Sequence, residues 1–267
     1  MGIVVAVVNQ KGGVGKSTTA VNLSAAVARR GRRTLLVDLD PQGNATSGLG
    51  IPKERLRASV YDVLVHRLPL RAVSLQTAVE GLELVPSTVA LAGAEVELVE
   101  VEGREERLRA ALRPVLDRYD LILVDCPPSL GLLTVNALVA AHQVLLPIQC
   151  EYYALEGLSS LLQTIELVQG SLNPDLQIGG VVLTMYDGRT NLSEQVAREV
   201  RAFFGDRVYR TVIPRSVRLA EAPSYGLPIS LYDPQSRGAQ AYEALSEEVT
   251  ARLWPQTALA GADAGDE

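Results

Sequence analysis

Ten residues near the N-terminus, NQKGGVGKST (9–18), combine three glycines, two lysines and two hydroxyl side chains. Glycines let a backbone turn tightly and point its N–H groups at an anion, so this composition suits a phosphate. The stretch is close to the phosphate-binding loop G-x-x-x-x-G-K-[ST], with two departures. Gln10 stands where the first glycine belongs, and an additional lysine, Lys11, lies five residues before the expected Lys16.

We expect this loop to bind the phosphates of a nucleotide, because it follows an apolar run (3–8) and opens a helical stretch (16–30). Lys16 can reach the β- and γ-phosphates, Ser17 can ligate Mg²⁺ and Thr18 can hydrogen-bond the α-phosphate. The N-terminus of the helix adds a favourable dipole. The predicted nucleotide-binding residues of the loop are Gln10, Lys11, Gly12, Gly13, Val14, Gly15, Lys16, Ser17 and Thr18.

Two carboxylates follow in the stretch VDLDPQGNAT, at the C-terminal end of a second apolar run. Ligands of open α/β sheets bind at that edge, so we expect Asp38 near the metal and Asp40 where it can orient an attacking water. Residues two apart on an extended strand point the same way. Taken alone, either residue is also compatible with a solvated carboxylate at a strand end.

A third apolar run, LILVDC, ends in Asp125 and is broken by Pro127 and Pro128. An acidic residue at the end of a buried strand, in a chain with a phosphate loop, is typical of a second metal-binding motif. Asp125 is therefore predicted to hold Mg²⁺. The predicted metal site consists of Ser17, Asp38 and Asp125.

The elements that must position these residues alternate along the chain. Apolar strand candidates lie at 3–8, 34–39, 82–85, 121–126, 143–148, 178–184 and 208–213. Helix candidates lie at 16–30, 87–99, 103–117, 131–141, 154–170, 191–204 and 238–253. Such alternation predicts an α/β fold with a doubly wound, mostly parallel sheet flanked by helices. We expect one nucleotide-binding domain over 1–254 and a disordered acidic tail over 255–267.

Composition excludes several classes of protein. No apolar run approaches the roughly 20 residues that a membrane-spanning helix needs, and the N-terminus has no basic flank of a signal peptide. The two cysteines lack metal-ligand spacing and are interpreted as reduced thiols of a cytoplasmic protein. The net charge is −6, so the whole molecule is not an obvious polyanion binder.

KGGVGKST, VDLDPQGN and VDCPPS together resemble the deviant Walker A ATPases of the P-loop class. Within them, DLDPQGNAT, TMYDGRTNLSEQV and IPRSVRLAEAPSYGLPI are similar to the ParA/Soj-type chromosome- and plasmid-partitioning ATPases. The resemblance extends from residue 2 to about residue 253. It implies an ATP hydrolase with ATP and Mg²⁺ as cofactors, weak alone and stimulated by partners. It also implies a cytoplasmic, nucleoid-associated location.

The resemblance accounts for the additional lysine. In that family the first glycine is missing, and a signature lysine, here Lys11, reaches the phosphates of a second subunit in an ATP-bound homodimer. Such a lysine supplies charge where it develops during phosphoryl transfer. The implied catalytic residues are therefore Lys11, Lys16 and Asp40. The resemblance also implies that Gly12 lies where the subunits meet and that Pro214 and Ser216 lie beside the adenine, although many relatives have Asn at the latter position.

The resemblance further implies non-specific binding to duplex DNA, with Arg189, Arg215 and Arg218 as the best matches. Between residues 189 and 218, seven arginines and three acids leave a modest net charge of +4. Without the family, arginines on the helical stretch 191–204 fit a solvated face better. Contacts to phosphates predict steep salt dependence and no base readout. The implied protein partner is a centromere-binding protein of the ParB/Spo0J type.

Three alternatives compete with a DNA-partitioning ATPase. A MinD-like ATPase would act at a membrane surface, but that class ends in a basic amphipathic helix and this chain ends in acidic residues. A relative that delivers metal clusters or reduces a substrate would need cysteine ligands, and no C-x-x-C occurs. A non-enzymatic dimerisation clamp is disfavoured by Asp40.

Overall fold

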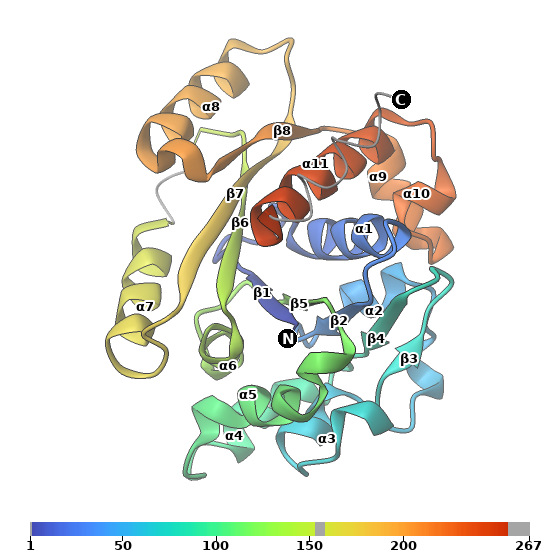
Figure 1. The fold of residues 1–267 in the computed structure, drawn as a ribbon, viewed down its shortest axis with the longest axis vertical. Helices are drawn as coiled ribbons and strands as arrows, with labels where there is room; N and C mark the ends of the chain where they lie inside the picture. The colour runs from blue at the N-terminus through green and yellow to red at the C-terminus, as the bar shows by residue number, and fades with distance from the viewer. Residues whose placement is uncertain (1, 153–157, 256–267) are drawn as a thin grey trace, which may run out of the picture.

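The structure is a computed structural model that describes residues 2–152 and 158–255. The predicted acidic tail, apart from Pro255, lies outside these residues. Within the described part of the chain, one eight-stranded sheet has the order β3-β4-β2-β5-β1-β6-β7-β8 (Figure 1). The strands are β1 (Ile3–Val7), β2 (Thr34–Asp38), β3 (Leu75–Gln76), β4 (Leu82–Val85), β5 (Leu121–Asp125), β6 (Gln143–Gln149), β7 (Gln177–Tyr186) and β8 (Val208–Pro214).

All neighbouring strands are parallel except the short edge strand β3, which runs antiparallel to β4. The α-helices are α1 (Lys16–Arg29), α2 (Asn44–Gly48), α3 (Val60–Leu64), α4 (Leu91–Glu97), α5 (Arg107–Leu112), α6 (Leu132–Ala140), α7 (Leu158–Ser171), α8 (Asn191–Phe204), α9 (Val217–Glu221), α10 (Ile229–Tyr232) and α11 (Arg237–Leu253). The predicted doubly wound α/β class is confirmed.

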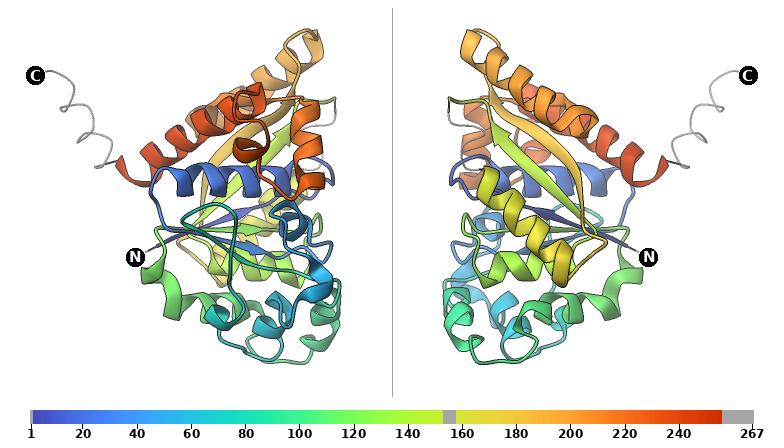
Figure 2. Two further views of the ribbon diagram at one scale, coloured as in Figure 1. Left: turned by 90° about the vertical axis from the view of Figure 1, so that its right-hand side faces the viewer. Right: turned by 90° about the vertical axis from the view of Figure 1, so that its left-hand side faces the viewer.

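Alternation along each central strand builds two cores. In β1, Val4 and Ala6 face one core while Val5 and Val7 face the other. The second core is closed by α1 and α11, which lie side by side on one face of the sheet (Figures 1 and 2). Residues of α3 to α8 contribute to the first core. Burial on both faces explains why these strands are apolar throughout.

Several helix predictions were too long, and local chemistry gives the reason. The predicted helix 103–117 contains Pro114, which lacks an N–H, so α5 ends at Leu112 and continues as a 3₁₀ turn, η4 (Arg113–Arg118). The predicted helix 87–99 begins only at residue 91, and the segment before it is a turn in which the N–H groups of Leu91 and Ala92 donate to the carbonyls of Thr88 and Val89. The short elements β3, α2, α3, α9 and α10 were missed, since two to five residues show no clear periodicity.

Candidate nucleotide site

The loop between β1 and α1 turns through two left-handed glycines. Gly13 has φ 75° and Gly15, immediately before α1, has φ 86°, which other residues rarely adopt. The turn aims the N-terminus of α1 into a pocket of about 430 Å³. Its walls include the loop, Asp40, and two residues that precede α10, Pro223 and Leu227. This is the arrangement that a phosphate requires at a helix N-terminus.

Two clamps hold the loop against the sheet. The side chain of Asn9 donates to the Pro147 carbonyl at 2.7 Å and accepts from the Lys11 N–H at 2.9 Å. The Thr184 hydroxyl, on β7, donates to the Val14 carbonyl at 2.8 Å. Sequence reasoning missed both residues. Asn9 directly precedes the motif, so its role could have been predicted from the sequence. Thr184 lies 170 residues from Val14, and no pattern near it in the sequence indicates this contact.

The two lysines of the loop have opposite environments. Lys16 is 6% exposed, and its ammonium donates to the Lys11 carbonyl at 3.0 Å. Burial lowers the pKa of Lys16, while the charges of Asp125 and Asp40 oppose that shift. The side chain of Lys11 is exposed. One lysine is therefore poised inside the pocket, and the other is available outside it.

Asp125, at the end of β5, is fully buried, and neither carboxylate oxygen has a hydrogen-bond partner of ordinary geometry among the described residues. Burial raises its pKa well above the usual range, with a further increase from the charge of Asp38, whereas the neighbouring Ser17 hydroxyl and Lys16 lower it. A buried, unpaired carboxylate is costly unless a cation accompanies it. The residues therefore fit a Mg²⁺ ion held with phosphate and water oxygens.

No group of three or more His, Cys, Asp or Glu side chains in the described ranges could hold a metal alone. Magnesium at nucleotide sites commonly takes only one or two carboxylates and completes its shell with phosphates and waters. The donors present, Asp125 with Ser17, match that pattern. Both cysteines, Cys126 and Cys150, are free and buried, as expected.

Asp38 lies beside Asp125 across paired β2 and β5, but its oxygens already have partners. The backbone N–H and hydroxyl of Thr46 donate to Oδ2 at 2.8 and 2.7 Å, and the N–H of Asp40 donates to Oδ1 at 3.2 Å. Burial raises the pKa of Asp38 to about 6, and these hydrogen bonds oppose the shift. The arrangement lets Asp38 fix the loop that carries Asp40, and its predicted metal role stays a prediction.

Asp40 lines the pocket and is 6% exposed. Its Oδ1 accepts from the Gln42 N–H at 2.9 Å, which directs the carboxylate. Met185, which also lines the pocket, has φ 51°, an uncommon backbone conformation for a residue with a side chain. Strain of this kind often marks a functional site.

The remaining loop residues and the predicted adenine contacts are placed as follows. Gln10 and Gly12 are exposed, Val14 is 1% exposed, and Gly12, Ser17 and Thr18 line the pocket. Pro214 ends β8, and Ser216 caps α9 through its hydroxyl, which accepts from Leu219 N. Neither Pro214 nor Ser216 belongs to the pocket wall. Their contact with a base stays a prediction.

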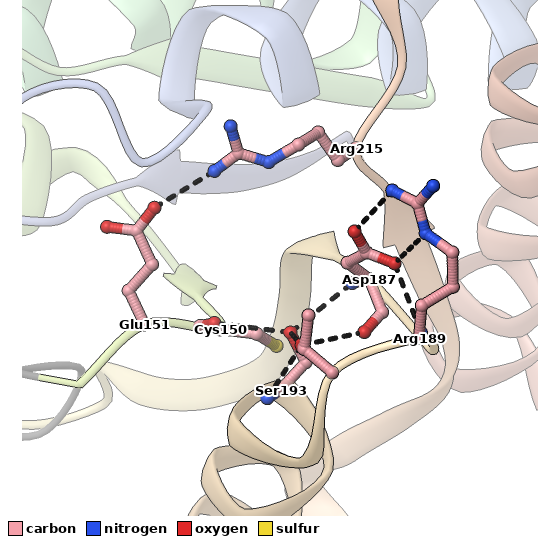
Figure 3. A network of polar contacts seen from close by, with 7 residues as sticks. Cys150, Glu151, Asp187, Arg189, Ser193 and Arg215 are labelled. Atoms are coloured by element: carbon pink, nitrogen blue, oxygen red, sulfur yellow. Dashed lines mark hydrogen bonds and ion pairs between the residues drawn. The ribbon is translucent and has the colours of Figure 1, made fainter.

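Two of the predicted DNA-contacting arginines, Arg189 and Arg215, have carboxylate partners in Figure 3. Arg189 makes a two-pronged contact with Asp187, at 2.9 and 2.7 Å. Arg215 reaches Glu151 at 3.0 Å. These residues follow β6, β7 and β8, parallel neighbours whose carboxyl ends share the edge that carries the phosphate loop. Arg218 pairs with Glu221 at 3.1 Å.

Comparisons with known proteins identify the family of the chain. Residues 2–178 match the family model of an AAA domain. The chain is 60% identical to the sporulation initiation inhibitor protein Soj of Bacillus subtilis, over 94% of this chain and 99% of that protein. It is 53% identical to the chromosome partitioning protein ParA of Myxococcus xanthus, over 96% of this chain and 91% of that protein.

Solved structures show the same fold. Cobyrinic acid a,c-diamide synthase of Mycobacterium smegmatis, with a bound ATP analogue and magnesium, has a TM-score of 0.85 and 40% identity, with 96% and 97% of the two chains covered. The cell division ATPase MinD of Pyrococcus furiosus has a TM-score of 0.74 and 28% identity, with 93% and 98% covered. The nucleotide and metal of the first structure agree with the predicted cofactors. The sequence relatives and the site geometry together show that the chain belongs to the Soj/ParA family of chromosome-partitioning ATPases.

Proposed function

We propose that ATP closes this chain into a homodimer that binds duplex DNA without sequence preference and hydrolyses ATP slowly. The dimer acts with a ParB/Spo0J-type partner to segregate a chromosome or plasmid. One observation carries the proposal: two lysines of the same loop are separated by environment, with Lys16 buried in the pocket and Lys11 exposed at its rim. A site formed by one subunit alone would need only Lys16 to bind the phosphates. The exposure of Lys11 supports a role of this second lysine toward a partner subunit.

Within one subunit, the chain binds and orients the nucleotide. The glycine turn and the first N–H groups of α1 receive the phosphates, and the ammonium of Lys16 moves from the Lys11 carbonyl to a phosphate oxygen. Bound Mg²⁺ supplies positive charge at the β- and γ-phosphate oxygens. Asp125 and Ser17 hold that ion. Pairing with it relieves the energetic cost of the buried Asp125 carboxylate.

Hydrolysis requires a water in line with the γ-phosphate and charge stabilisation as the bond breaks. Asp40 orients that water, because its carboxylate is held by the Gln42 N–H at the pocket wall. Lys11 of the second subunit stabilises the developing charge. Because Lys11 reaches the phosphates only in the dimer, the isolated subunit should hydrolyse ATP slowly.

DNA binding follows from the arginines at the same edge of the sheet. Arg189 and Arg215 are exposed, with 88% and 61% of their side-chain surface accessible. Closing a dimer doubles such a surface, and phosphate contacts need no particular sequence. A location in the cytoplasm, on the nucleoid, follows from this activity.

A membrane-surface role like that of MinD is the second candidate, because a MinD structure shares the fold. No helix in the described ranges is long and apolar enough to span a bilayer, but a surface role does not require one. The higher identity to Soj and ParA favours DNA as the surface. The same identities, at 60% and 53%, place partitioning ahead of the synthase activity named for the 40% identical structure.

Binding to a random-sequence duplex should be measured with ATP, with ADP and without nucleotide, at two salt concentrations. Tight binding with ATP alone, weakening steeply with salt, is the expected result. Equal binding in all three states would contradict the switch. Binding to anionic liposomes rather than DNA would favour the membrane-surface role.

A further inference from the structure

A second cavity, unrelated to the nucleotide pocket, lies among α3, α5 and η4. Its volume is about 740 Å³, within the range of small-molecule sites. These helices lie together in the lower part of Figure 1. Because η4 leads into the N-terminal end of β5, whereas the phosphate loop follows the C-terminal end of its parallel neighbour β1, the two sites lie at opposite edges of the sheet.

The cavity is positively charged although the protein is acidic overall. Four arginines line it, together with Glu102 and Glu106. Glu106 pairs with Arg109, which does not line the cavity. The four lining arginines, which form no ion pair with any described residue, are Arg67, Arg71, Arg107 and Arg118.

Two of these arginines lack the partner that a structural role would supply. The Nε of Arg107 is buried and has no hydrogen-bond partner among the described residues. Burial, with a further contribution from the charge of Arg67, lowers the pKa of Arg107. Arg67 itself has φ 56°, a conformation that a non-glycine residue rarely adopts. Two neighbouring guanidinium groups repel each other, and an anion bound between them would offset that repulsion.

The rest of the wall is apolar, with Leu68, Ala110 and Ala111 among its members. We propose that this cavity binds a small molecule that has an anionic group, a phosphate or carboxylate, and an apolar body. The anion lies between Arg67 and Arg107, and the body packs against α5. A recessed site of this volume suits a small molecule better than a nucleic-acid backbone, which contacts open surface.

The test uses 1-naphthyl phosphate, an aromatic phosphate, and calorimetric titration of the full chain. MgADP is kept saturating so that the phosphate loop is occupied. One-to-one binding is expected, with affinity reduced at least about tenfold by Arg107→Gln and by Arg67→Asn, which tolerates the left-handed backbone. Arg113→Gln is the matched control, because Arg113 begins η4 directly after α5, is exposed and does not line the cavity.

Thermal unfolding gives an independent readout. Without the probe, Arg107→Gln should unfold at the same or a higher temperature than the wild type, since it removes a repulsion. With the probe, the wild type and Arg113→Gln should be stabilised and Arg107→Gln should not. No binding at millimolar probe, or equal loss in the Arg113 control, would overturn the proposal. Binding of duplex DNA lost with Arg107→Gln but no binding of the probe would also overturn it.

Discussion

The ammonium of Lys16 donates a 3.0 Å hydrogen bond to the carbonyl oxygen of Lys11. In the structure, which holds no nucleotide, the Lys16 ammonium is therefore bonded to a backbone carbonyl of the same loop that is predicted to bind phosphate. The contact joins the lysine of the common phosphate-loop pattern, Lys16, to the additional lysine, Lys11. We propose that a bound phosphate displaces this carbonyl and releases the backbone at Lys11, which would couple nucleotide binding to the lysine that we propose reaches a partner subunit.

Replacing Lys16 with Ala should abolish ATP binding, because no other cation lines the described part of the nucleotide pocket. We expect a loss of at least about 100-fold in affinity, which corresponds to about 2.7 kcal/mol. The fold should survive, since burial already disfavours the charged lysine. Equilibrium binding of a fluorescent ATP analogue, with circular dichroism as the folding control, measures both. Affinity like that of the wild type would remove the loop assignment.

Gly12→Val should leave the monomer intact and block the ATP-dependent dimer. A Cβ at Gly12 meets no described atom within 4 Å in the single chain, so a side chain there should not disturb the fold of the monomer. Analytical ultracentrifugation with a non-hydrolysable ATP analogue measures the dimer. Gly13→Val is the contrasting variant, because its φ of 75° makes a side chain costly in the monomer itself. A Gly12→Val protein that dimerises normally would place the interface elsewhere.

Asp40→Ala should keep ATP binding and dimerisation but reduce turnover by about 100-fold or more, the usual scale for losing a water-orienting or proton-accepting group. Among the described contacts, the Asp40 side chain makes one hydrogen bond, which it accepts from the Gln42 N–H, so the local fold should change little. Phosphate release in the presence of DNA measures the effect. Asp38→Ala is the comparison: its carboxylate holds Thr46 and the Asp40 backbone, so it should also lower stability. Normal turnover in Asp40→Ala would remove that residue from the mechanism.

The contiguous parts of the site could be predicted from sequence. Asn9 to Thr18 form one loop, and Asp38 and Asp125 end neighbouring parallel strands, so pattern and sheet geometry bring them together. Contacts between distant segments could not be predicted. The Thr184 clamp on Val14 depends on the position of β7 in the sheet, which no local pattern encodes.

The same limit applies to charge. The sequence indicated that arginines gather after β7 and β8, but not that Glu151 would face Arg215 from 64 residues away. Asp38 was expected to contact metal because it ends a strand. The structure adds contacts that the sequence did not indicate: Oδ2 of Asp38 accepts from Thr46, eight residues on, and Oδ1 accepts from the Asp40 N–H. Short helices such as α2 arise from such tertiary contacts rather than from periodicity.

Asp125→Asn should stabilise the nucleotide-free protein, and more at pH 8 than at pH 5. An acid whose pKa is raised on folding contributes stability below its ordinary pKa and loses it as the pH rises through the raised value. Asp38 acts in the same direction, with its pKa raised from 3.8 to about 6. Removing the unpaired charge of Asp125 should gain about 1–3 kcal/mol at pH 8.

Urea denaturation at both pH values, with and without MgADP, measures this. Stabilisation by MgADP should be lost in Asp125→Asn. Asp120→Asn, just before the same strand, is the control of opposite sign, because pairing with Arg33 lowers the pKa of Asp120 and its charge is favourable at pH 8. A variant of Asp125 that is less stable than the wild type at pH 8 would show that the carboxylate has a structural partner.

Asp187→Asn should strengthen DNA binding by the ATP-bound protein. In the present structure Asp187 holds Arg189 through two short contacts, and the guanidinium lowers the pKa of Asp187 to about 2. A DNA phosphate must compete with that carboxylate, so its removal leaves Arg189 free to contact the backbone. Glu199→Gln changes the net charge equally, but Glu199 accepts only from Gln195 among the described contacts. The difference between the two variants therefore isolates the release of Arg189 from the general effect of charge.

Fluorescence anisotropy across a salt series should show a slope of log K against log salt that is steeper by about 0.9 for Asp187→Asn, the value for one added phosphate contact. Arg189→Ala should lose that increment, and equal slopes in all three variants would move the DNA surface away from Arg189.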